Sequence, residues 1–253
     1  YGWKLLVSAV LDTTYNNRYQ LVIGKVYTPS ELAYYNKGNQ FPSFIIGNID
    51  VSIDSVLLPT MSKEQDDVAR VRSMTRRAIK TRTYLMAPMM MGILAIATPL
   101  VRLLLTEKWL PCVDFLRIFC IIYMFYPVHT TNLNAIKAMG RSDLFLKLEV
   151  IKKVMGVVML IITIPMGIMP MLYGRLINSV LSQVINSWPN KKLIRYSYPE
   201  QLKDILPGIL TAALMGAGVF LITLLPVSDL LRVLLGIGFG VLFYWGISEI
   251  FHI

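Results

Sequence analysis

Four basic side chains lie inside stretches of the sequence that are otherwise suited to the interior of a membrane. They are Arg18, Lys37, Arg117 and Arg175. A charged side chain at the centre of a bilayer costs about 2.5 kcal/mol or more unless it faces protein or water. A guanidinium offers a planar fork of donors that fits phosphate oxygens. We therefore predict that these residues line a hydrated cavity that binds an anionic head group such as a pyrophosphate.

The alternative is that these cations have a structural role, either as partners of acidic residues or by extending to the head groups. The acids concerned are Asp12, Asp50, Asp54 and Asp114. This alternative carries more weight for Lys37, Arg117 and Arg175, which lie closer to the predicted outer side. Arg18 is the best single candidate for the cavity because it lies near the middle of a polar helix.

Carboxylates and amides add further chemistry to the helix predicted over residues 30–61. Asp50 and Asp54 are one helical turn apart and share a face, so the pair could exchange a proton or hold a sodium ion as the protein changes conformation. Alternatively, both are structural partners of basic residues. Aromatic rings and amides on the outer half of the same helix are suited to sugar hydroxyls. These are Tyr34, Tyr35, Asn36, Asn39 and Gln40.

No signature of catalysis or metal binding accompanies these groups. His129 and His252 are the only histidines, too few for a paired-histidine metal site. Cys112 and Cys120 are eight residues apart in one predicted helix, and we interpret them as free thiols. We therefore expect no metal ion, no cofactor and no enzymatic activity.

The composition predicts the elements that must hold these side chains. The 253 residues are 55% hydrophobic and only 16% charged, against about 25% charged in a soluble domain. Residues 154–173 and 205–228 contain no charge, and about 20 apolar residues suffice for a helix to cross a bilayer. The sequence thus predicts an all-α, polytopic membrane bundle.

The formal net charge of +10 does not indicate a nucleic-acid partner. The basic residues lie mainly between the apolar runs, a pattern that orients helices and attracts anionic lipid head groups. Membrane lipids, and no nucleic acid, are the partners that we expect from this pattern.

Eight transmembrane helices account for the length. Their approximate bounds are 3–27, 30–61, 78–105, 109–139, 142–165, 168–190, 200–225 and 229–251. Capping boxes are expected at Thr28 with Glu31, Ser62 with Gln65, and Ser197 with Glu200. The first span is polar in its middle, so it must face a water-filled cavity.

The loops give the orientation. Seven basic residues, from Lys63 to Arg82, lie between the second and third spans, and further basic residues follow the fourth and sixth spans. We therefore place these loops and both ends of the chain in the cytoplasm. The connection from Ser62 to Lys80 is expected to be either an amphipathic helix on the membrane surface or a solvated linker.

Several motifs of this sequence resemble one known family. They are Tyr15-Asn16-Asn17, Ile23-Gly24-Lys25, the segments 34–42 and 58–62, Glu107-Lys108-Trp109, Tyr126-Pro127-Val128-His129, Asn132-Leu133-Asn134 and Gly140-Arg141-Ser142-Asp143. The resemblance is to the polysaccharide-exporter family of O-antigen and capsule flippases, within the multidrug, oligosaccharidyl-lipid and polysaccharide exporter superfamily.

The resemblance implies a fold of two six-helix lobes followed by two extra helices. Residues 1–199 would form the carboxy-terminal lobe and residues 200–253 the extra pair, so the amino-terminal lobe is expected as a missing partner. The implied function is to move undecaprenyl-pyrophosphate-linked oligosaccharide across the bacterial inner membrane by alternating access, for lipopolysaccharide, capsule or exopolysaccharide assembly. A polysaccharide polymerase is a possible partner. In the family, basic residues hold the anionic substrate, and the matching positions are Arg18 and, less closely, Arg117 and Arg175.

Two other functions remain open from the sequence alone. A multidrug exporter of the same superfamily would need a cavity rich in carboxylates, whereas this sequence has an excess of intramembrane cations. A membrane-embedded glycosyltransferase or polysaccharide polymerase would need a general base or a metal-binding carboxylate cluster near a sizeable loop. The longest predicted loop carries Glu64, Asp66 and Asp67 among seven cations.

Overall fold

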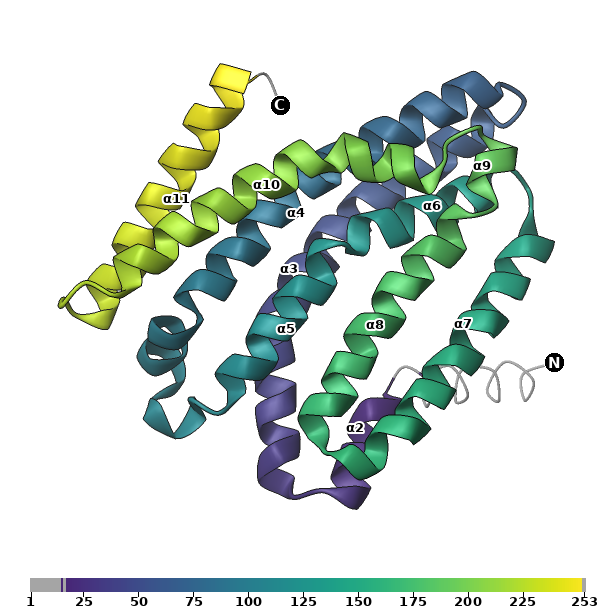
Figure 1. Ribbon diagram of the computed structural model, residues 1–253. Coiled ribbons are helices and arrows are strands. Elements are labelled where there is room, and N and C mark those ends of the chain that lie inside the picture. Colours follow the sequence, from purple (N-terminus) through teal and green to yellow (C-terminus); the bar gives the residue numbers. More distant parts are fainter. Residues whose placement is uncertain (1–14, 16, 252–253) are drawn as a thin grey trace.

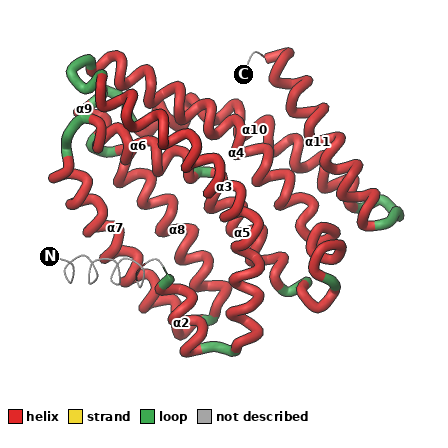
Figure 2. The backbone as a smooth tube through the Cα atoms, turned by 180° about the vertical axis from the view of Figure 1, so that it is seen from behind, coloured by secondary structure: helices red, strands yellow, loops and turns green. Residues whose placement is uncertain are grey.

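The structure, a computed structural model, describes Tyr15 and residues 17–251. Throughout these residues the regular elements are helices and no strand occurs (Figures 1 and 2). The α-helices are α2 (Arg18–Val26), α3 (Pro29–Lys63), α4 (Val68–Leu105), α5 (Cys112–Met124), α6 (Tyr126–Ala138), α7 (Ser142–Thr163), α8 (Ile168–Ser187), α9 (Asn190–Leu193), α10 (Tyr198–Thr223) and α11 (Asp229–Phe251). Two 3-10 turns, η1 (Glu107–Trp109) and η2 (Ile164–Met166), join neighbouring helices.

The helix lengths confirm a polytopic membrane bundle. In the described part of the chain, five helical segments are long and apolar enough to cross a membrane: α3, α4, α5 with α6, α10 and α11. The helices α7 and α8 have 22 and 20 residues, which is also enough to cross at 1.5 Å per residue. Most of the first predicted span, including Asp12, lies outside the described residues.

Local capping chemistry explains the starts of α3, α4 and α10. The Glu31 carboxylate accepts hydrogen bonds from the backbone and hydroxyl of Thr28, at 2.9 and 2.7 Å, and Glu200 does the same for Ser197. The capping box expected at Ser62 is wrong. Ser62 lies inside α3, and its hydroxyl donates to the Leu58 carbonyl at 2.9 Å. Asp67 caps α4 instead, accepting from the Arg70 amide at 2.9 Å.

The connection from Ser62 to Lys80 is neither a separate surface helix nor a linker. A short turn ends at Asp67, and α4 then continues without interruption from Val68 to Leu105. Val71 and Ile79 are fully buried on one side of this first half of α4. The amphipathic pattern therefore belongs to the charged amino-terminal extension of a spanning helix.

The predicted helix over residues 109–139 is divided in two. Helix α5 ends at Met124 and α6 begins at Tyr126, with Phe125 between them. Pro127 lies in the first turn of α6 and has no N–H to donate to the preceding turn. The proline explains why the helix is interrupted at this point.

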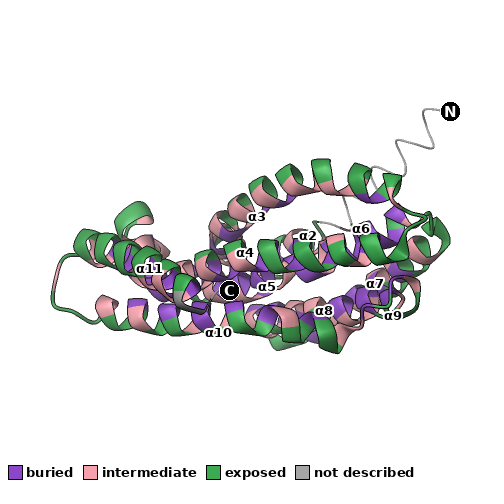
Figure 3. Cartoon of the chain, turned by 90° about the horizontal axis from the view of Figure 1, so that it is seen from above, coloured by how far each residue is buried: buried purple, intermediate pink, exposed green. Residues whose placement is uncertain are grey.

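The helices form two neighbouring groups (Figure 1). The long helices α4 and α10 run side by side, and α11 packs against both. Helices α3, α5, α6 and α8 make up the other group, with α7 at its edge and α2 at one end. Buried residues face the interior of the bundle (Figure 3). Large apolar side chains such as Ile161, Leu214 and Leu242 remain exposed, as is typical of helices surrounded by lipid.

Candidate functional site

Two of the four basic residues that were predicted to line the cavity lie against the same aromatic ring. Arg18 on α2 and Arg175 on α8 lie over Tyr19, with guanidinium carbons 5.1 and 5.4 Å from the ring centroid. The sequence separates these residues by more than 150 positions, and the packing of α2 near α8 brings them together. We refer to Arg18, Arg175 and the rings around them as the arginine cluster.

Aromatic side chains hold Arg175 in place. Its guanidinium donates a hydrogen bond to the Tyr35 hydroxyl and lies 4.9 Å from the ring centroid of Phe119. Tyr35 is only 1% exposed, and its ring packs edge-on against Phe119 at 5.2 Å. Cation–π contacts of this kind stabilise a cation without neutralising it.

Arg18 is held mainly through Tyr15. Its guanidinium carbon lies 3.9 Å from the Tyr15 ring centroid, and one nitrogen donates to the Tyr15 carbonyl oxygen at 2.7 Å. Gly156 of α7 leaves room for both residues. A Cβ atom at Gly156 would lie 2.9 Å from the Tyr15 hydroxyl and 3.1 Å from an Arg18 nitrogen.

Neither guanidinium has a carboxylate partner among the residues that the structure describes. Within the same residues, Arg18 Nε, the Tyr19 hydroxyl and Asn178 Oδ1 are buried without a hydrogen-bond partner. The arginine cluster thus combines two uncompensated positive charges with unsatisfied polar atoms. Such a site favours a ligand that carries several negatively charged oxygens.

The structure does not bring Lys37 and Arg117 to this cluster. Lys37 donates to Gln40 on the same helix at 3.0 Å and lies over the Trp109 ring. Arg117 pairs with Asp114 at 3.7 Å and donates to Thr98 of α4 at 3.2 Å. Arg117 and Phe119 are two residues apart on α5, so they point in nearly opposite directions.

Of the five candidate sugar contacts, some lie near the arginine cluster and the others lie away from it. Tyr35 and Asn39 lie on the buried face of α3 that looks toward α5, where Asn39 accepts a hydrogen bond from the Tyr123 hydroxyl at 2.8 Å. Tyr34 packs edge-on against Trp109. Asn36 and Gln40 are exposed and bond to Gln20 and Lys37. Only Tyr35 and Asn39 lie beside the groups that surround Arg175.

Asp50 and Asp54 share a face of α3, and both face Arg82 of α4. Arg82 is 0% exposed, pairs with Asp50 at 3.6 Å and donates a hydrogen bond to Asp54. Asn134 and Thr130 of α6 complete the cluster, which we call the carboxylate cluster: Asn134 donates to Asp54 at 2.6 Å and Arg82 donates to Thr130 at 3.1 Å. Two carboxylates thus share one fully buried guanidinium.

Arg82 is the member of the carboxylate cluster that the sequence did not indicate. We counted it with the loop cations between the second and third spans, and the structure shows that this was wrong. The nearby Arg76, Arg77 and Lys80 are exposed, so the local sequence gives no sign that Arg82 differs. The only available signal was the pair Asp50 and Asp54, which needs a basic partner at the same depth.

A row of aromatic rings connects the two clusters. Phe119, next to Arg175, stacks on Tyr123 at 6.1 Å, and Tyr123 meets Tyr126 edge-on at 6.1 Å. Tyr126 in turn stacks on His129 at 5.5 Å. These rings lie on α5 and α6, on either side of the break at Phe125.

A separate network of buried amides joins α6, α8, α9 and α10. Gln201 accepts hydrogen bonds from Asn132 at 2.7 Å and from Ser187 at 3.1 Å, and Asn190 donates to Asn132 at 2.6 Å. All four side chains are completely buried, and most of their polar groups bond to one another. We therefore assign this network a structural role. Across the described residues, no group of three or more His, Cys, Asp or Glu residues could hold a metal ion.

Three known bacterial proteins and one family model are similar to this chain in sequence. Residues 1–114 match the family model described as "Polysaccharide biosynthesis protein". The chain is 21% identical to the lipopolysaccharide biosynthesis protein WzxC of Escherichia coli K12, covering 74% of this chain and 37% of that protein. It is 28% identical to a membrane protein in the cps region of Klebsiella pneumoniae, covering 66% and 33%. The teichuronic acid biosynthesis protein TuaB of Bacillus subtilis is 20% identical, covering 88% and 47%.

A solved structure has the same fold. The lipid II flippase MurJ in its inward closed conformation superposes with a TM-score of 0.79 at 19% identity, over 98% of this chain and 54% of that one. The chain therefore spans about a third to about half of the length of the proteins that it matches. Taken together with the apolar helices, these matches show a multi-pass membrane protein that is similar to bacterial polysaccharide biosynthesis proteins over part of their length and that has the fold of MurJ.

Proposed function

We propose that this chain forms one lobe of a flippase that moves an undecaprenyl-pyrophosphate-linked oligosaccharide across the membrane, for the assembly of lipopolysaccharide, capsule or exopolysaccharide. The observation that carries the proposal is the arginine cluster. Two guanidinium groups from different helices converge on Tyr19, and neither has a carboxylate partner within the described residues. The family relationship supplies the class of substrate.

The chemistry of the arginine cluster fits a pyrophosphate head group. Two guanidinium groups can share the oxygens of adjacent phosphates, and each charge-assisted hydrogen bond contributes about 1.5–3 kcal/mol. The rings of Tyr15, Tyr19 and Tyr35 form the walls of the cluster. Aromatic faces of this kind also pack well against the apolar faces of sugar rings. In this proposal Tyr35 and Asn39 are the sugar contacts nearest the phosphates.

We assign residues 1–199 to the lobe and residues 200–253 to the extra pair of helices. The lobe would form one side of a central cavity, and a second lobe would supply the other side. The coverage of the relatives supports a second lobe, because the chain spans only about a third to about half of the proteins that it matches. Transport would proceed by rocking of the lobes without covalent chemistry on the substrate.

The carboxylate cluster is our candidate for ion coupling. Two carboxylates share one guanidinium, so one negative charge remains when all three groups are ionised. A proton or a sodium ion could neutralise that charge at a cost lower than leaving it buried. We propose that the cluster takes up the coupling ion through Asp50, whose two oxygens have no hydrogen-bond partner among the described residues.

The test is a transport assay on the intact protein in proteoliposomes. Labelled undecaprenyl-pyrophosphate-linked oligosaccharide is supplied on one side, and its arrival on the other side is followed with an impermeant lectin. We expect Arg175→Gln and Arg18→Gln each to lower the initial rate by about tenfold or more, since each removes at least one charge-assisted contact. Arg117→Gln is the matched control, and its rate should stay within about twofold of the wild type because it lies outside the cluster.

Wild-type rates in both cluster variants would exclude the arginine cluster as the head-group site. The same assay separates the competing functions. Transport of a lipophilic cation in place of the oligosaccharide would indicate a multidrug exporter, and extension of the sugar chain by the purified protein would indicate a polymerase.

A further inference from the structure

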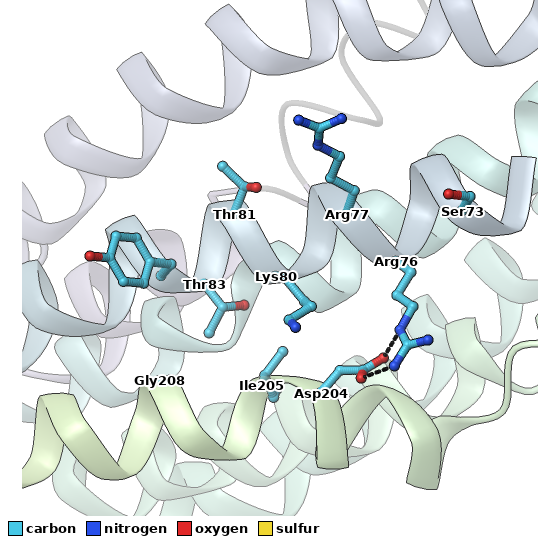
Figure 4. Close-up of a pocket in the computed structure, with 10 residues that line it drawn as sticks. Ser73, Arg76, Arg77, Lys80, Thr81, Thr83, Asp204, Ile205 and Gly208 are labelled. Carbon is cyan, nitrogen blue, oxygen red and sulfur yellow. Dashed lines mark hydrogen bonds and ion pairs between the residues drawn. The ribbon is translucent and has the colours of Figure 1, made fainter. Parts of the chain in front are cut away.

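A cavity of about 460 Å³ lies between α4 and α10, and none of the residues that line it belongs to either cluster described above (Figure 4). Its wall includes the basic residues Arg76, Arg77 and Lys80, together with Ser73, Thr83 and Asp204. Helices α4 and α10 run side by side here (Figure 1), and two ion pairs, Arg72 with Glu200 and Arg76 with Asp204, connect them.

The cavity lies where the charged part of each helix ends. In α4, residues 83–101 carry no charge, and in α10 the charge-free stretch begins directly after Asp204. A stretch of about 20 uncharged residues corresponds to the hydrocarbon layer. The cavity is therefore at the depth of the lipid head groups, on the side that the basic loops assign to the cytoplasm.

The one carboxylate in the wall is already neutralised. Asp204 accepts two hydrogen bonds from Arg76, at 2.7 and 2.6 Å, and a third from the Tyr196 hydroxyl at 2.8 Å. Burial and the hydrogen bond to Asp204 raise the pKa of Tyr196, which therefore stays a protonated donor. Lys80 points from α4 toward α10 (Figure 4) and has no ion pair in the part of the chain that the structure describes. The cavity consequently keeps a net positive charge.

Thr83 supplies an independent indication of a ligand. This residue is 1% exposed, and its hydroxyl has no hydrogen-bond partner within the described residues. It extends from α4 on the same side as Lys80 (Figure 4). A buried hydroxyl without a partner costs about 1–3 kcal/mol in a protein interior unless a ligand satisfies it.

An apolar groove adjoins the cavity. The groove has a volume of about 620 Å³, and α4, α10 and α11 supply most of its wall, including Met89, Leu100 and Val241. Tyr84 borders both the cavity and the groove. The cationic cavity and the apolar groove thus adjoin each other along the same helices.

We propose that this composite site binds one anionic phospholipid of the surrounding membrane. Its phosphate would lie against Lys80 and the remaining edge of Arg76, with Thr83 as a hydroxyl donor, and its acyl chains would fill the apolar groove. A phosphate monoanion complements the net positive charge of the cavity, and the position at head-group depth suits a lipid better than a soluble anion. The site is independent of the transported substrate.

The experiment is native mass spectrometry of the intact protein titrated with phosphatidylglycerol or with phosphatidylcholine. We expect the wild type to bind phosphatidylglycerol more tightly, and Lys80→Gln to weaken that binding by about fivefold. Thr83→Val, which removes only the hydroxyl, should weaken it by about threefold. Arg70→Gln is the matched control. It removes one positive charge from the same helix, but Arg70 is not among the residues that line the cavity and it pairs with Glu64 at 3.2 Å, so binding should change by less than about twofold.

Equal losses in Lys80→Gln and Arg70→Gln would show that only general surface charge matters, and would overturn the proposal. Unchanged binding in both Lys80→Gln and Thr83→Val would do the same. Displacement of phosphatidylglycerol by a lower concentration of undecaprenyl pyrophosphate would assign the cavity to the transported substrate instead.

Discussion

Arg82 and Arg175 are both arginines held among transmembrane helices, and their surroundings differ in kind. Arg82 is completely buried and meets two carboxylates, an amide and a hydroxyl. Arg175 meets aromatic rings and a single phenol hydroxyl, with no carboxylate partner among the described residues. Charge inside the membrane therefore does not by itself identify a substrate site. The guanidinium that lacks a counter-charge is the one that can take up an anion.

The largest effect on stability is expected from substitution of Arg82. Arg82→Ala leaves Asp50 and Asp54 without their shared partner, and the loss of one member of a buried pair costs about 3–5 kcal/mol. We expect a clear fall in the thermal unfolding temperature of the purified protein in detergent. Adding Asp50→Asn to Arg82→Ala should restore part of the stability. If Arg82→Ala were as stable as the wild type, Arg82 would not be locked by its carboxylates.

The second largest effect on stability is expected at Gly38, where α3 packs on α5 and so positions Tyr35 beside Arg175. Gly38 of α3 packs directly on α5, and a Cβ atom there would lie 2.6 Å from Phe115 Cβ and 2.8 Å from the Leu116 amide nitrogen. Because α5 backbone cannot move aside easily, Gly38→Ala should destabilise the protein by about 1–3 kcal/mol.

Gly156→Ala is the comparison for that substitution. At Gly156 the obstructing atoms are the far ends of Tyr15 and Arg18, which can rotate away. Thermal unfolding should therefore change little in Gly156→Ala, while transport falls because Arg18 is displaced. Similar unfolding temperatures for the two variants would contradict the close packing of α3 on α5.

The smallest effect on transport is expected from removal of the hydroxyl group that bonds to Arg175. Tyr35→Phe keeps the ring and removes only the hydroxyl that Arg175 bonds to. The loss of one hydrogen bond of about 1 kcal/mol should reduce transport by about fivefold, with little change in stability. A transport rate equal to the wild type would mean that the ring alone orients Arg175.

The sequence predicted the helices well because helix ends depend on local chemistry. The start expected at residue 30 is observed at Pro29, and the start expected at residue 142 is observed at Ser142. Proline, glycine and capping residues act within a few positions of the chain. The error at Ser62 is also local: Asp67, five residues later, caps the next helix.

The site could be predicted only in part, because it depends on which helices meet. The spacing of Asp50 and Asp54 correctly indicated one shared face, but their partner Arg82 comes from another helix and lies next to exposed basic residues in the sequence. Arg117 and Arg175 look equivalent in the sequence, yet one pairs with Asp114 and the other lies among rings. The role of Arg18 and Arg175 in substrate binding remains a prediction for the transport assay.

The parallel contact between α4 and α10 has a mechanical consequence. The two helices are joined near their amino-terminal ends by ion pairs and farther along by the close approach of Gly216 to Met91. Tyr244 of α11 adds a hydrogen bond to the Tyr84 carbonyl at 3.0 Å. A tilt of α4 would therefore carry α10 and α11 with it, because contacts along most of their length join the three helices.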